Sequence, residues 1–185
     1  MSWNWWIDEQ LPNEQKIKKY INLSNNIFNK FNINNINLSA LEIGAGHGLK
    51  TYWLHKLFKS LDSIEPNKIL YDGLNNMIKK NNINNVNIMN KSIEDFNTNK
   101  KYNIILFINC FLFITDKKNI INKCKKLLEK NGYILILEST NFLKIEKINT
   151  NINMKMINSI NTITHNLKII YYGIFENAII YFCKI

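Results

Sequence analysis

The chain has 185 residues, of which 46% are hydrophobic, and it carries three cysteines and a formal net charge of +10. This length and apolar content are typical of one globular domain with a sizeable core, and three widely spaced cysteines do not suggest a disulfide framework. No histidine, cysteine or acidic group has the spacing of a zinc site, so we expect no metal. No segment reaches the ~18 apolar residues of a membrane span or resembles a signal peptide, which predicts a cytoplasmic protein with no membrane partner.

The basic residues are all lysines, 24 in number, and the sequence contains no arginine. Proteins that bind nucleic acids favour arginine, because its guanidinium group contacts phosphates and guanine in bidentate fashion. The lysines are also spread over the expected helix surfaces rather than gathered in one block. We therefore discount RNA as a partner but keep it open, since a basic surface attracts any polyanion. The heavy use of lysine, asparagine and isoleucine suggests an AT-rich genome.

Helical and strand-like segments alternate along most of the chain. The central strands are near-continuous apolar runs, as in sheets that helices cover on both faces. Two short asparagine-rich runs, at 32–37 and 81–87, are interpreted as helix ends and turns, and Asp116 as the N-cap of its helix. The expected elements are a helix near 12–30, strand 38–43, helix 49–59, strand 61–65, helix 67–80, strand 86–90, strand 102–109, helix 116–130 and strand 132–138.

The last part of the chain predicts two further strands, at about 167–174 and 176–183. They are joined by a very short turn at Phe175–Asn177, so they must be antiparallel. The fold class is therefore α/β, with a doubly wound, mostly parallel seven-stranded sheet that ends in a C-terminal antiparallel hairpin.

The most informative motif directly follows the expected strand 38–43. Gly44, Gly46 and Gly48 stand at every second position, and Glu42 lies two places before the first of them. Glycine lets the main chain pass close to a ligand, and the N-terminus of a following helix offers N–H groups to negative charge. The spacing Gly-x-Gly-x-Gly differs from the dinucleotide pattern Gly-x-Gly-x-x-Gly, which argues against a dehydrogenase.

A second acid lies where such a site needs one. Glu65 falls 21 residues after Gly44, at the end of the next expected strand. An acid in this place accepts hydrogen bonds from ribose hydroxyls. Pro66 cannot continue the strand ladder, and we expect it to begin the following helix and to fix Glu65 at the strand end.

These motifs together resemble the class I S-adenosylmethionine-dependent methyltransferases. The similarity continues in the same order over residues 36–138: segment 89–96 resembles the family's segment after the third strand, 102–110 its fourth strand, and 127–138 the entry into its fifth strand. The resemblance implies S-adenosylmethionine as cofactor, with S-adenosylhomocysteine as product. It also implies one domain in four parts, namely an N-terminal helical or lid segment (1–35), the cofactor-binding core (36–138), a substrate-side connection (139–166) and the terminal hairpin (167–185).

The resemblance also assigns roles to residues. The glycine loop would pack against the methionine part of the cofactor, Glu65 would hold the ribose, and Ser92 with Ile93 would flank the adenine. Ser92 stands where the family usually has an acid, so the adenine contact there is weaker or is made by the main chain. The expected cofactor-binding residues are Glu42, Gly44, Ala45, Gly46, Gly48, Glu65, Pro66, Ser92, Ile93 and Asn109.

The acceptor is not marked by a comparable motif. Asn109-Cys110-Phe111-Leu112 departs from the Asn-Pro-Pro-Tyr or Asp-Pro-Pro-Tyr signature, which argues against methylation of adenine amino groups. The catalytic residue stays open, with weak candidates at the pocket rim: His47, Asn109, Glu138 and Tyr52. We expect methyl transfer to an oxygen or nitrogen of a small-molecule or sugar-type acceptor. The alternatives are an RNA methyltransferase and, given Ser92 and Asn103 in place of the usual acids, a non-catalytic subunit of a complex.

Overall fold

The computed structural model describes residues 14–30, 32–139, 168–175 and 178–184. The chain divides into two compact units, Met1–Phe96 and Asn97–Ile185, which are described separately below. Residues 1–13 of the expected N-terminal segment and nearly all of the connection expected at 139–166 fall outside the described residues. The prediction of a single domain with four parts stays a prediction.

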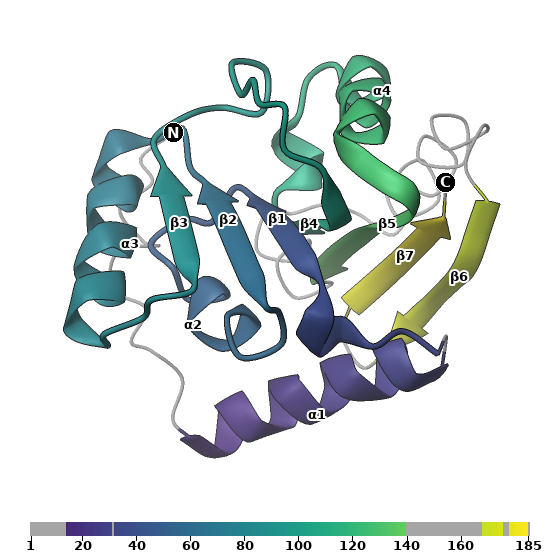
Figure 1. Ribbon diagram of the computed structural model, residues 1–185, viewed down its shortest axis with the longest axis horizontal. Helices are drawn as coiled ribbons and strands as arrows, with labels where there is room; N and C mark the ends of the chain where they lie inside the picture. Colours follow the sequence, from purple (N-terminus) through teal and green to yellow (C-terminus); the bar gives the residue numbers. More distant parts are fainter. Residues whose placement is uncertain (1–13, 31, 140–167, 176–177, 185) are drawn as a thin grey trace. The chain divides into compact units, whose positions relative to one another are not determined.

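Three parallel strands form the centre of the first unit. They are β1 (Ser39–Ile43), β2 (Ser60–Ile64) and β3 (Val86–Met89), and they lie side by side in the order β3-β2-β1 (Figure 1). The register pairs Ile43 with Ile64 and Ile64 with Met89, so the three strands end level with one another. The loops that follow β1 and β2 therefore begin at the same edge.

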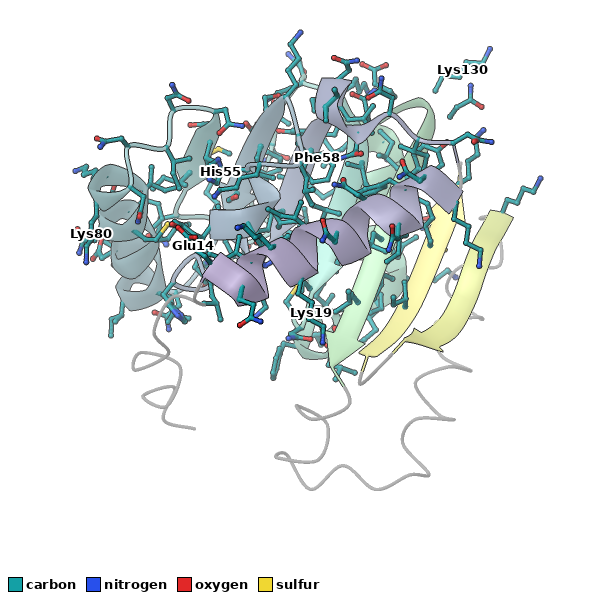
Figure 2. The ribbon with its side chains drawn as sticks, turned by 90° about the horizontal axis from the view of Figure 1, so that it is seen from below. Glu14, Lys19, His55, Phe58, Lys80 and Lys130 are labelled. Carbon is teal, nitrogen blue, oxygen red and sulfur yellow. The ribbon has the colours of Figure 1, made fainter. Side chains whose placement is uncertain are left out.

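The helices of the first unit bury apolar side chains against these strands and against one another. They are α1 (Glu14–Lys30), α2 (Thr51–Leu54) and α3 (Lys68–Lys80), with a 3-10 turn at Asn35–Asn37. Phe28 of α1 meets Phe58 edge to face, with ring centroids 5.8 Å apart, and Figure 2 shows Phe58 beside the α1 ribbon. Leu74 of α3 is fully buried in a cluster with Met77 and Ala45 of the glycine loop.

The helix expected at 49–59 is wrong in its length, since α2 spans only Thr51–Leu54. Turns follow it: the N–H groups of Lys56 and Leu57 donate to carbonyls three residues back, at 3.2 and 2.9 Å, rather than four. A helix this short offers no extended N-terminal dipole, so the loop before it must bind any ligand through its own groups.

Asparagine side chains from other parts of the first unit donate hydrogen bonds to the main-chain carbonyls of the turns after α2. Nδ2 of Asn85 donates to the carbonyl oxygens of His55 (2.8 Å) and Phe58 (3.1 Å), and Nδ2 of Asn35 donates to that of Leu57 (2.7 Å). Main-chain carbonyls at a helix end need such partners when they are buried. The two asparagine-rich runs therefore do more than form the predicted turns. They also supply hydrogen-bond donors to the carbonyls that follow α2.

The turns predicted in those runs are present as well. Asn32 and Asn82 follow α1 and α3 with φ angles of 54° and 52°, a left-handed conformation that asparagine tolerates better than most residues. The interpretation of both runs as helix ends is confirmed.

The described residues of the second unit include the strands β4 (Tyr102–Ile108), β5 (Leu128–Ser139), β6 (Lys168–Phe175) and β7 (Ala178–Lys184). They lie in the order β4-β5-β7-β6, and Figure 1 shows the last two in yellow. The pair β4 and β5 is parallel, whereas β7 is antiparallel to both β5 and β6. The expected antiparallel pair at the end of the chain is confirmed.

In the described part of the second unit the α-helix is α4 (Lys117–Leu127), and a 3-10 turn at Phe111–Phe113 precedes it. Asp116 caps α4 as predicted, since its side chain accepts a hydrogen bond of 3.1 Å from the N–H of Asn119. The helix ends three residues earlier than expected, because Leu128 already pairs with Tyr102 of β4. The mixed α/β class, with parallel strands and a C-terminal antiparallel pair, is as predicted.

Within the described ranges, no helix is both long and apolar enough to traverse a bilayer.

Candidate functional site

The loop after β1 has the backbone that its glycines predict. Gly44, Gly46 and Gly48 have φ angles of 70°, 60° and 95°, in the left-handed region that favours glycine. The N–H groups of Gly44 and Ala45 both donate to the carbonyl oxygen of Ile64, at 2.9 and 3.1 Å. The loop is therefore tied to the end of β2.

Glu65 lies directly beyond β2 and completes this connection. Its Oε2 accepts a hydrogen bond of 2.8 Å from the N–H of Gly46, and its Oε1 accepts one of 2.9 Å from the N–H of Asn67. The residue is only 5% exposed. Burial raises the pKa of Glu65, and these two hydrogen bonds oppose the rise. Each carboxylate oxygen has two lone pairs, so both retain the capacity to accept a bond from a ligand hydroxyl.

Two asparagines that the sequence reasoning missed hold Glu65 in place. Nδ2 of Asn90 donates to the carbonyl oxygens of Glu65 (2.8 Å) and Pro66 (3.1 Å). Asn67 is the N-cap of α3, since its Oδ1 accepts from the first N–H groups of the helix. The prediction that Pro66 begins the helix is wrong, because α3 starts at Lys68 and Pro66 precedes the cap. The known preference of asparagine for N-caps was the signal that could have found Asn67.

Glu42 is buried within the first unit and is hydrogen-bonded to residues on either side of the glycine loop. It is 2% exposed, and its Oε2 accepts hydrogen bonds of 2.7 Å from both the Thr51 and the Ser63 hydroxyls. Burial raises the pKa of Glu42 against these two bonds. The side chain thereby joins β1, β2 and the start of α2. A direct contact of Glu42 with a cofactor stays a prediction.

Two of the loop glycines meet different surroundings. A Cβ atom on Gly46 would have no protein heavy atom within 4 Å, so this face of the loop is open. A Cβ atom on Gly48 would overlap the methyl group of Met77 and would lie 2.8 Å from Cδ1 of Leu74. Gly48 thus permits the loop to pack on α3, whereas Gly46 leaves room for a ligand beside Glu65.

The remaining candidates of the first unit lie around this centre. His47 packs against α3 where Gly73 leaves space, since a Cβ on Gly73 would be 3.1 Å from that of His47. After β3, the Ser92 hydroxyl donates to Oδ2 of Asp95 (2.8 Å) and accepts from the Asp95 N–H (3.1 Å). Ile93 is buried, and Tyr52 is half-buried.

The second unit contains the other two candidates, Asn109 and Glu138. Asn109 directly follows β4 with a φ of 57°, and its N–H donates to the carbonyl oxygen of Leu137 at 2.8 Å. Glu138 is 1% exposed, and its Oε1 accepts a hydrogen bond of 2.8 Å from the N–H of Phe111. Its Oε2 is buried and has no hydrogen-bond partner in the part of the chain that the structure describes.

The protonation of Glu138 reflects this environment. Burial raises its pKa to about 8, although the hydrogen bond from Phe111, the other nearby main-chain N–H groups of the turn at 110–112 and the charge of Lys117 act against the rise. Lys117 is itself held to main-chain carbonyls, with Nζ 2.5 Å from that of Ile114 and 3.3 Å from that of Leu112. Burial lowers the pKa of Lys117. Glu138 therefore holds its proton to a higher pH than an ordinary glutamate does.

A family model for AdoMet-dependent proline di-methyltransferases matches residues 3–168. The chain belongs to this family. The resemblance to S-adenosylmethionine-dependent methyltransferases is thereby confirmed, as are the enzyme class and the cofactor. No curated protein matches this sequence significantly.

Solved structures show the same fold at low sequence identity. A SAM-dependent methyltransferase from Aquifex aeolicus is 13% identical with a TM-score of 0.71, and the match covers 92% of this chain and 97% of that one. The N-methyltransferase NodS from Bradyrhizobium japonicum WM9 is 13% identical with a TM-score of 0.66, covering 95% and 98%. Coclaurine N-methyltransferase, solved with N-methylheliamine and SAH, is 16% identical with a TM-score of 0.57, covering 71% of this chain.

The chain spans only part of some of these proteins. It covers 38% of coclaurine N-methyltransferase and 57% of TehB from Haemophilus influenzae. The matches confirm the class I methyltransferase fold.

Proposed function

We propose that this methyltransferase transfers the methyl group to the nitrogen of an amine acceptor. The family description names the di-methylation of proline, which is a reaction at nitrogen. Two proteins of the same fold are N-methyltransferases, and one of them was solved with an N-methylated amine. These names favour nitrogen over oxygen within the small-molecule or sugar-type acceptors expected from the sequence.

Two features of the first unit support a cofactor site there. The open face at Gly46 offers space beside a buried carboxylate, and the lone pairs of Glu65 suit ribose hydroxyls. Glu65 would hold the ribose and the glycine loop the methionine part. The Ser92 hydroxyl is bonded to Asp95, so the adenine would be held through the buried Ile93 side chain and the main chain beside it.

When bound, the cofactor supplies an activated methyl group on its sulfonium sulfur. The protein then has to align the acceptor nitrogen with that methyl carbon and keep the nitrogen lone pair free of a proton. The observation that carries the cofactor site is the 2.8 Å hydrogen bond from the Gly46 N–H to the Glu65 carboxylate, because it holds the loop main chain beside the acid. The family description carries the amine acceptor.

Calorimetry with S-adenosylmethionine and S-adenosylhomocysteine tests the cofactor site. We expect Glu65→Ala to weaken binding at least tenfold, since two hydroxyl contacts are lost. Glu14→Ala, an exposed acid on α1, is the matched control and should bind like the wild type. Equal affinity in wild type and Glu65→Ala would refute the assignment of Glu65.

The acceptor class is tested by mass spectrometry of probes incubated with enzyme and cofactor. The probes are a peptide that begins with proline, a simple secondary amine, a catechol, a sugar and an RNA oligonucleotide. We expect a mass increase of one or two methyl groups on the amines alone. Methylation of the catechol or the sugar would move the reaction to oxygen. Methylation of the RNA would favour that alternative, and cofactor binding without turnover of any probe would favour a non-catalytic subunit.

A further inference from the structure

We propose that the second unit carries a docking surface for an extended acidic segment of a partner protein. The surface consists of lysines gathered at the amino ends of β4 and β5, and we call it the lysine edge. Its members are Lys100, Lys101, Lys126, Lys130, Lys168 and Lys184, of which the last is half-buried and the others are exposed. The inference goes beyond the proposed function and does not depend on the nature of the methyl acceptor.

The strand register brings one half of the lysine edge together. Lys168, the first residue of β6, lies directly opposite Lys184, the last residue of β7. Lys184 in turn lies opposite Tyr133 of β5, and its Nζ is 5.8 Å from the centroid of that ring. Like charges directly opposite one another on neighbouring strands destabilise a sheet. A fold that keeps such a pair gives up stability at this place, which is typical of a functional surface.

The other half of the lysine edge lies where β4 begins and α4 ends. Tyr102, the first residue of β4, pairs with the first residue of β5, which directly follows α4. The Nζ of Lys101 donates to the main-chain carbonyl of Lys126 in the last turn of that helix. The Nζ of Lys100 lies 5.2 Å from the centroid of the Tyr102 ring. Lys130 is the third residue of β5 and belongs to the same end of the strands.

Acids are few at the lysine edge. In the described residues of the second unit the acids are Asp116, Glu129 and Glu138, and of these only Glu129 lies at this edge. Asp116 precedes α4 and Glu138 is near the carboxyl end of β5, so both belong to the opposite end of the strands. Neighbouring strands are about 4.8 Å apart, less than the Debye length of about 8 Å at physiological ionic strength. The potentials of the ammonium groups therefore add, and the edge attracts anions.

The shape of the lysine edge suits an extended acidic segment. The four strands lie in the order β4-β5-β7-β6, so the lysines form a row that is about 14 Å long at about 4.8 Å per strand. Side chains on one face of an extended segment recur about every 6.6 Å. Three alternating carboxylates therefore span the row, and each can accept charge-assisted hydrogen bonds from the ammonium groups.

Nucleic acid suits this surface less well. The sequence contains no arginine, the residue that holds phosphates in bidentate fashion. Proteins that bind single strands also stack bases on accessible aromatic rings. The two rings that lysines of this edge contact do not offer such a platform: Tyr102 is buried, and Tyr133 is half-buried and stacked on Phe182. The observations therefore favour carboxylates of a protein over phosphates of a nucleic acid.

Fluorescence anisotropy tests the surface, with a labelled, C-terminally amidated peptide of six glutamates alternating with serine as probe. Lys168→Gln/Lys184→Gln removes two charges from the lysine edge. Lys79→Gln/Lys80→Gln is the matched control, since it removes the same charge from exposed lysines of α3. At about 50 mM salt we expect peptide affinity to fall about tenfold in the first variant and about twofold or less in the control. Both variants should bind S-adenosylhomocysteine like the wild type.

The outcomes distinguish the occupants. Equal losses in the two variants would mean that net charge attracts the peptide, which overturns the inference. A wild type that does not bind the peptide at low salt overturns it as well. An RNA oligonucleotide with six phosphates that binds more tightly than the peptide, and loses affinity in Lys168→Gln/Lys184→Gln, would assign the surface to nucleic acid and overturn the acidic segment. None of these results bears on the amine acceptor, which is tested separately by methylation of the probes.

A measurement on the wild type covers the case in which the double variant does not fold. A carbodiimide joins carboxylates to lysines that they contact, and mass spectrometry locates the resulting amide bonds. We expect the peptide on lysines of the lysine edge, including Lys168 and Lys184, and little of it on Lys79 and Lys80. Cross-links spread evenly over the exposed lysines of the chain overturn the inference.

Discussion

The main-chain N–H of Gly46 and Oε2 of Glu65 are 2.8 Å apart, so the loop after β1 and the residue after β2 hold each other. The same loop is bonded to β2 through Gly44 and Ala45. A cofactor therefore meets a loop whose shape is already set, and little conformational entropy is lost on binding.

The two glycines should respond differently to an added methyl group. Gly46→Ala places its Cβ in open space, so only the left-handed φ opposes it, at about 1–2 kcal/mol. The methyl group does occupy the space beside Glu65, and we expect a loss of S-adenosylmethionine affinity of tenfold or more. Calorimetry and urea unfolding of the same protein measure both effects.

Gly48→Ala is the counterpart in the same loop. Its Cβ would overlap Met77 and crowd Leu74, so we expect a stability loss of about 2–4 kcal/mol, larger than at Gly46. Urea unfolding checks the order. If Gly46→Ala proved the more destabilising of the two, the open face at Gly46 would be disproved.

Asn90 should act on the cofactor site through Glu65. Asn90→Ala removes the donors to the Glu65 and Pro66 carbonyls and should cost about 1–3 kcal/mol of stability. We expect cofactor affinity to fall less than in Glu65→Ala, because the carboxylate itself remains. Asn76→Ala, at an exposed position of α3, is the control. If Asn90→Ala bound the cofactor as tightly as the wild type, Glu65 would not need the hydrogen bonds from Asn90.

Glu138 should make stability depend on pH. The folded protein holds the Glu138 proton more tightly than the unfolded chain, because the pKa rises from 4.5 to about 8. The stabilisation is therefore complete below the unfolded pKa and is lost as pH rises toward 8, on the order of a few kcal/mol. The raised pKa values of Glu42 and Glu65 act in the same direction.

Urea unfolding of the wild type between pH 5 and 9 measures this loss. Glu138→Gln cannot titrate, so its free energy of unfolding should depend less on pH. Glu129→Gln replaces an exposed glutamate of β5 and should follow the wild type. Parallel curves for Glu138→Gln and the wild type would mean that the carboxyl titrates normally in the fold.

The parts of the fold that the sequence predicted are those set by local patterns. The apolar runs of β1 and β4 depend on neighbouring residues. The spacing from Gly44 to Glu65 is part of a family motif, and the structure places Glu65 against the glycine loop as that spacing implies. The N-cap at Asp116 is likewise a local preference.

The errors arose where distant residues decide the structure. α2 ends at Leu54 because amide groups of Asn35 and Asn85, which lie 22 and 30 residues from the carbonyls they bind, complete the turn. The residues after Leu127 join β5 because Tyr102 pairs with Leu128. The burial of Glu138 and its orphaned oxygen depend on the main chain 27 residues away, which no local pattern in the sequence reports.

The asparagine contacts also impose a rule on substitution. At positions 35, 85 and 90 the side-chain amide gives hydrogen atoms to carbonyls, whereas at position 67 the side-chain oxygen receives them. Aspartate preserves only the receiving role. In homologous sequences, exchange between asparagine and aspartate should thus be common at position 67 and rare at the other three, although all four residues look alike in the chain.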